Sequence, residues 1–139
     1  MTTTIQRLAL IFGIGFLLAA GAGFVQGGTT MDADMETAPR ALGLFPVNLL
    51  HNLVHLAFGV WGVAASRSWG ASRRYAQIAG VTYLLLAVLG FVTPELFGLV
   101  PIGGNDIWLH VALGLPLAIA GFTARRPVAP VPPNPRPLA

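Results

Sequence analysis

Four segments of the chain are almost wholly apolar, and the charged residues gather between them. The segments cover residues 8–25, 46–65, 75–94 and 107–124, and none contains Asp, Glu, Lys or Arg. An amphipathic helix of a soluble protein would carry a charged face, whereas a helix that crosses the ~30 Å hydrocarbon core of a bilayer needs about 20 apolar residues. The pattern therefore predicts four transmembrane helices, near residues 5–26, 45–66, 74–94 and 105–125.

Composition supports a lipid environment. Of the 139 residues, 55% are hydrophobic and only 9% are charged, whereas soluble domains carry about 25% charged residues. The chain has no cysteine, which excludes disulfides, thiolate metal sites and cysteine nucleophiles. We expect the lipid bilayer as partner, and no nucleic acid.

The charges divide between the two ends of the predicted helices. Arginines precede the first segment, separate the second from the third and follow the fourth, whereas all five acidic residues lie in the other two loops; only Arg40 breaks this division. Basic residues are retained in the cytoplasm. The sequence therefore predicts a multi-pass protein of the inner (plasma) membrane with both termini cytoplasmic.

The first and third segments resemble each other. When Arg7 is aligned with Arg74, RLALIFGIGFLLAAGAGFV matches RYAQIAGVTYLLLAVLGFV at ten positions, including a stripe of small and aromatic residues: Ala9, Gly13, Phe16, Ala20 and Gly23 in one, Ala76, Gly80, Tyr83, Ala87 and Gly90 in the other. Such a stripe lies on one helical face and allows close packing in lipid. A cleaved signal peptide is the competing interpretation of the first segment, but a signal peptide does not need this face.

The second and fourth segments align with an offset of 55 residues, which places Pro46 on Pro101, His55 on His110 and Gly59 on Gly114. The fold class predicted is all-α: a polytopic four-helix bundle made of two tandem helical hairpins, related as a parallel repeat. The transmembrane domain is expected over residues 1–126, and the Pro-rich residues 127–139 are expected to form a disordered cytoplasmic tail. Helix-packing positions are expected at Gly13, Gly23, Gly59, Gly80, Gly90 and Gly114.

Polar residues follow one stripe of the second segment and the start of the fourth. We expect them to form an intramembrane cluster near the outer side: Asn48, His51, Asn52, His55, Asn105, Asp106 and His110. With a helix starting near Pro46, His55 would lie about 13 Å below that start, and polar groups at such depth usually face the bundle interior. Asn105 is expected to cap the fourth helix.

Three interpretations of the cluster remain open. The side chains could form a structural hydrogen-bonded network. They could hold a metal ion or a haem as cofactor, through His51, His55, Asp106 and His110, because imidazoles spaced by four residues suit coordination. They could also line a polar pocket or proton relay that is open to the outside. No Ser-His-Asp set or carboxylate pair lies within the segments, so no catalytic residues are expected.

The runs LFPVNLLHNLVHLAFGVWG, YAQIAGVTYLLLAVLGF and LFGLVPIGGNDIWLH resemble the bacterial membrane proteins catalogued as domain of unknown function 4383 (DUF4383). The resemblance covers roughly residues 5–124. It implies a four-helix integral membrane protein and transfers no activity. The sequence thus predicts a structural or small-ligand-binding membrane protein; the alternative is a small metal- or haem-binding electron-transfer protein. The sequence leaves open whether the chain forms a homo-oligomer or binds a partner in a membrane complex.

Overall fold

The computed structural model describes residues 3–126, which form four helices and one small hairpin. The helices are α1 (Thr4–Gly27), α2 (Leu49–Ala65), α3 (Trp69–Val92) and α4 (Asn105–Thr123), and the two-residue strands are β1 (Arg40–Ala41) and β2 (Phe45–Pro46). The all-α class predicted from the sequence is confirmed. The predicted Pro-rich tail, residues 127–139, lies outside the described residues.

The starts of two helices depart from the predicted spans because Ser68 and Asn48 act as N-caps. The α3 helix begins at Trp69 because the Ser68 side chain accepts a hydrogen bond from the Ala71 amide. The α2 helix begins only at Leu49, because Pro46 pairs in the hairpin and Asn48 caps the helix from an extended conformation. Its 17 residues place α2 among the shorter apolar helices, whereas α1, α3 and α4 are each long and apolar enough to cross a membrane.

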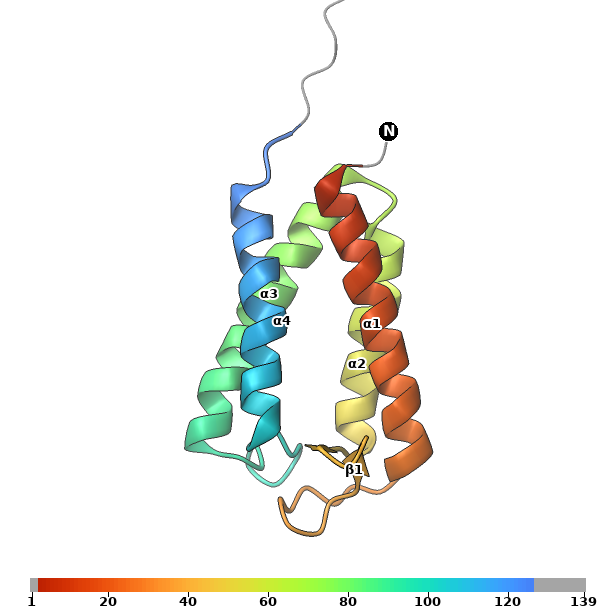
Figure 1. The fold of residues 1–139 in the computed structure, drawn as a ribbon, viewed down its shortest axis with the longest axis vertical. Helices are drawn as coiled ribbons and strands as arrows, with labels where there is room; N and C mark the ends of the chain where they lie inside the picture. The colour runs from red at the N-terminus through yellow and green to blue at the C-terminus, as the bar shows by residue number, and fades with distance from the viewer. Residues whose placement is uncertain (1–2, 127–139) are drawn as a thin grey trace, which may run out of the picture.

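The chain forms two helical hairpins that lie side by side (Figure 1). Most helix contacts are within the hairpins, α1 with α2 and α3 with α4. The turn around residues 66–68 and the described ends of the chain lie at one end of the bundle, which we call the turn end. Residues 28–48 and 93–104 lie at the opposite end, which we call the loop end (Figure 1).

The packing faces of α1 and α3 are the stripe recognised in the sequence. All ten residues of that stripe are buried. At Gly13, an added Cβ would lie 2.6 Å from the Val63 backbone nitrogen, and at Gly80 it would collide with the backbone of Ala118. Neighbouring helices therefore approach closely at these glycines, as expected for helices in lipid.

Two loops close the loop end of the bundle. The Met35 amide donates a hydrogen bond to Glu95 Oε1 (3.3 Å), and the Asn48 side-chain amide donates to the Leu99 carbonyl (2.8 Å). Both bonds join the first hairpin to the segment between α3 and α4. These bonds hold the two loops next to the polar residues of α2 and α4.

Candidate functional site

Six of the seven predicted cluster residues are buried together in the loop-end half of the bundle. The α2 helix and its cap supply Asn48, His51, Asn52 and His55, and α4 supplies Asp106 and His110. None of these residues is more than 7% exposed. His55 lies six residues after the first residue of α2, or about 9 Å along the axis. This is less than predicted because the helix begins at Leu49 and not near Pro46.

His51 is the central member of the cluster. Its Nδ1 lies 3.8 Å from Asp106 Oδ2, which is longer than a hydrogen bond. Its ring centroid lies 4.6 Å from that of His55 and 6.4 Å from that of His110. The equivalence inferred from the repeat, in which His51 corresponds to Asp106 and His55 to His110, thus brings residues of both hairpins to one place.

Two aromatic residues of the packing stripe, Phe16 and Tyr83, also border the cluster. The Tyr83 ring lies 5.2 Å from the His110 ring and 6.4 Å from the His55 ring, between centroids. Phe16 stacks on Tyr83 at 4.9 Å and on His55 at 5.8 Å. The sequence alignment of α1 with α3 places Phe16 on Tyr83. This equivalence could have predicted that both rings border the cluster, because a position shared by both halves faces the pseudo-symmetry axis between the hairpins.

The asparagines differ in their roles. Asn48 is satisfied: its Oδ1 accepts from the His51 amide (3.0 Å) and its amide donates to Leu99. Asn105 is exposed and donates to the Leu44 carbonyl at 3.3 Å. The N-cap of α4 is Gly104, at φ 61°, a backbone conformation that favours glycine. The predicted Asn105 cap is therefore wrong, and Asn105 lies outside the buried cluster.

Buried polar atoms without a hydrogen-bond partner are concentrated here. Within residues 3–126 they comprise both polar atoms of the Asn52 amide, Asp106 Oδ2, the hydroxyls of Tyr75 and Tyr83, and Nδ1 of all three histidines, His51, His55 and His110. An unsatisfied buried polar group destabilises a protein by about 1–3 kcal/mol. Seven of these eight atoms belong to the cluster and its neighbour Tyr83; Tyr75 lies apart, against Gly62 near the turn end.

The described residues contain no group of three His, Asp or Glu side chains arranged to hold a metal ion. The ligand set predicted from the sequence, His51, His55, Asp106 and His110, therefore does not converge as metal ligands in this structure. The Tyr83 ring packs beside both His55 and His110.

Cavities adjoin the cluster on two sides. On the side of α1 and α4, cavities of about 450 and 310 Å³ share Ala19, His55 and Leu109 in their walls. His51 and Asp106 also line the larger of these two. On the side of α2 and α3, a cavity of about 260 Å³ is lined by all three histidines and Tyr83. His55 borders all three cavities, so these spaces meet at polar atoms that lack partners.

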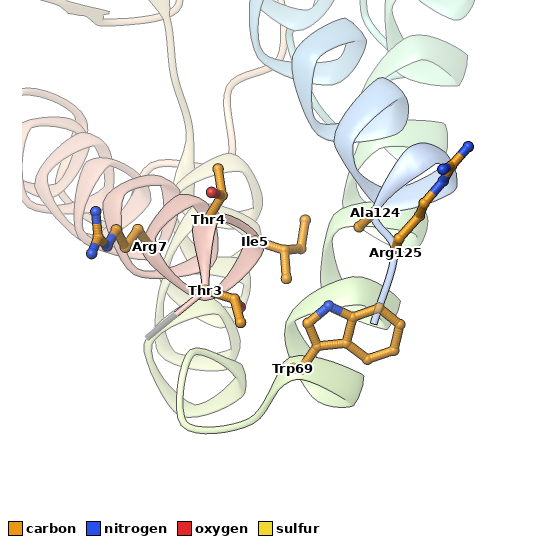
Figure 2. A pocket seen from close by; sticks show the side chains of 7 residues that line it. All are labelled: Thr3, Thr4, Ile5, Arg7, Trp69, Ala124 and Arg125. Atoms are coloured by element: carbon orange, nitrogen blue, oxygen red, sulfur yellow. The ribbon is translucent and has the colours of Figure 1, made fainter. Parts of the chain in front are cut away.

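A further pocket, of about 470 Å³, lies at the turn end between the start of α1, Trp69 and the end of α4. Its lining includes Arg7 and Arg125, but Figure 2 shows both side chains directed away from the pocket. The arginines therefore do not converge on a common ligand there.

The comparisons with known proteins identify a family of unknown function. The model of the family described as domain of unknown function (DUF4383) matches residues 6–123. No curated protein and no solved structure matches the chain.

Proposed function

The chain belongs to the DUF4383 family, and from this premise we propose that it is a membrane protein that binds a small ligand at the cluster of His51, His55, Asp106 and His110. The unpaired buried polar atoms around adjoining cavities carry the proposal. Native proteins pair nearly all such atoms with protein groups, water or ligands. A concentration of them beside open space indicates that the partner is a bound molecule.

The proposed orientation places this site towards the outside of the cell, in the plasma membrane. Apart from Arg40 in β1, the arginines of the described residues lie at or near the turn end, whereas the acidic residues lie at the loop end or beside it. The positive-inside rule then makes the turn end cytoplasmic. Both termini would be cytoplasmic, and the cluster would lie in the outer half of the bilayer.

A purely structural network is the second candidate, and one observation favours it. Asn48 joins the start of α2 to Leu99 through a satisfied side chain, which holds the two hairpins together. A structural network, however, requires its members to bond one another, and the His51–Asp106 distance of 3.8 Å exceeds hydrogen-bonding range.

A His55→Phe variant separates the two candidates. Phenylalanine retains a ring that can stack on Phe16 but removes the imidazole nitrogens. We expect the variant to fold, to melt at the same or a higher temperature in detergent, and to lose a small molecule that the natural protein retains from the membrane. Thermal unfolding and native mass spectrometry of both proteins measure these properties.

Asn105→Ala is the control, because it removes an exposed polar side chain at the same end of the bundle. We expect it to retain the bound molecule. If the natural protein and His55→Phe carry the same bound molecules, or if neither carries any and no added probe binds in a way that depends on His55, the ligand-binding proposal is wrong.

A further inference from the structure

We propose that the ligand is a long-chain hydroquinone, which enters sideways from the bilayer between α1 and α4 and places its hydroxyl groups at His51, His55 and Asp106. This inference rests on the proposed function, because it takes the cluster to be a ligand site. It adds the chemical class of the ligand and its route.

The route is an apolar groove between α1 and α4, the pair of neighbouring helices with few mutual contacts. The two cavities on this side, of about 450 and 310 Å³, share Ala19, His55 and Leu109, and residues within the segment 41–47 also line the larger one at the loop end. Their exposed surface is almost wholly apolar, and they end at His51 and His55, which are 4% and 7% exposed. A groove of this form accommodates a hydrocarbon tail outside and a polar head group inside.

The α1 wall of the groove includes three small residues, which lie among larger apolar side chains such as Ile11 and Leu18. Gly15, Ala19 and Ala22 recur at spacings of four and three and line the cavities. An added Cβ at Gly15 would meet nothing within 4 Å. This second stripe is distinct from the packing stripe that contains Gly13 and Phe16. It leaves space that neither helix fills, beside polar atoms without partners.

The head-group chemistry follows from the charges around the cluster. No arginine lines the three adjoining cavities, and the chain contains no lysine. A phosphate or sulfate head group would therefore lie beside the Asp106 carboxyl group without a cationic partner, which is unfavourable in a low dielectric. A neutral imidazole accepts a hydrogen bond at one of its two nitrogens, and a carboxyl oxygen also accepts, so an uncharged head group with hydroxyl donors fits.

Aromatic walls favour a ring-shaped head group over a glycerol-like one. Phe12 and Phe16 line the smaller of the two groove cavities, and Phe45 lines the larger one. The Phe16 and His55 rings are near-parallel, with an interplanar angle of 19°. Aromatic rings stack favourably on rings of this kind. A hydroquinone combines a flat ring with two hydroxyl donors, and it is soluble in the bilayer from which the groove is reached.

The first experiment measures the affinity of three probes with the same tail for the full-length protein in lipid nanodiscs. The probes are dodecylhydroquinone, its dimethyl ether, which cannot donate hydrogen bonds, and dodecyl phosphate, which is anionic. We expect the hydroquinone to bind about tenfold more tightly than the ether, as for the loss of one hydrogen bond, and the phosphate to bind most weakly. Equal affinities for the hydroquinone and the ether, or tighter binding of the phosphate, would overturn the head-group assignment.

The second experiment tests the route. Ala19→Leu fills the groove, whereas Ala57→Leu adds the same atoms to an exposed position of α2 outside the described cavities. We expect Ala19→Leu to weaken hydroquinone binding by about tenfold, or ~1.4 kcal/mol, and Ala57→Leu to leave it unchanged. Equal effects of the two variants would contradict access through the groove.

The oligomeric state of Ala19→Leu tests whether a second copy of the chain fills the groove. The His55→Phe variant distinguishes failure of this inference from failure of the proposed function. If Ala19→Leu changes the oligomeric state of the protein in detergent, a second copy of the chain occupies the groove and the inference is wrong. If a retained molecule depends on His55 but no dodecyl probe binds, the inference fails while the proposed function stands. If neither a retained molecule nor a probe depends on His55, both fail.

Discussion

Asn48 shows how one side chain can serve two structural roles at the border of the site. Its oxygen caps α2 by accepting from the His51 amide, and its amide nitrogen satisfies the carbonyl of Leu99, 51 residues further along the chain. The side chain is fully buried. His51 is therefore held at the start of its helix by a residue that also positions the loop above the cluster.

Replacing Asn48 with alanine should destabilise the protein by about 1–2 kcal/mol, the usual effect of losing an N-cap, with a further loss from the orphaned Leu99 carbonyl. Thermal or denaturant unfolding in detergent measures this change. Asn105→Ala is the matched control, since Asn105 is exposed and makes a single long hydrogen bond. A similar destabilisation by both variants would show that the Asn48 bonds contribute nothing specific.

Among the helices, the internal repeat of the sequence recurs as repeated contacts. Gly13 lies against the Val63 nitrogen and Gly80 against that of Ala118, while Gly59 approaches Leu17 and Gly114 approaches Leu84. These contact pairs are related by the two sequence offsets, 67 residues for α1 and α3 and 55 for α2 and α4. The same packing geometry therefore holds each hairpin.

Gly80→Ala should separate α3 from α4, because the added methyl group would overlap the backbone of Ala118. We expect a loss of roughly 1–3 kcal/mol in unfolding free energy, the typical effect of overpacking. Gly21→Ala makes the same change on α1 where nothing lies within 4 Å of the added atom, and it should be neutral or stabilising. If Gly80→Ala is as stable as Gly21→Ala, the close backbone approach is not needed for folding.

For the whole molecule, the two ends of the bundle differ in charge and in structure. The turn end has one short connection and most of the arginines, whereas the loop end carries the acidic first loop and the hydrogen bonds that join the hairpins (Figure 1). This asymmetry gives a definite orientation to test. Because the chain has no cysteine, a thiol reagent labels only the cysteine that is introduced.

Glu36→Cys and Arg67→Cys place a thiol at an exposed position of the loop end and the turn end respectively. In intact cells, we expect a membrane-impermeant maleimide to label Glu36→Cys and to leave Arg67→Cys unlabelled, because basic segments are retained in the cytoplasm. Both variants should react once the membrane is permeabilised. Labelling of Arg67→Cys in intact cells would reverse the proposed topology.

The sequence by itself determined the architecture, because periodicity and lipid solubility leave few choices. The length of the apolar segments predicted the helices, and the stripe shared by α1 and α3 predicted which faces of these two helices are buried. Four-residue spacing predicted that His51 and His55 share a face of α2, and the repeat predicted that His110 lies near them. These inferences rest on local geometry, which depends little on the rest of the fold.

Only the tertiary structure decided what surrounds the cluster. Spacing along a helix says nothing of the groove between α1 and α4, of Tyr83 beside both His55 and His110, or of the loop carbonyl that binds Asn48. Residue spacing also could not show that Asn105 lies outside the buried cluster. The exposure of Asn105 follows from the turn at Gly104. Whether polar side chains bond one another or remain open to a ligand depends on distances between helices, which packing of the whole bundle sets.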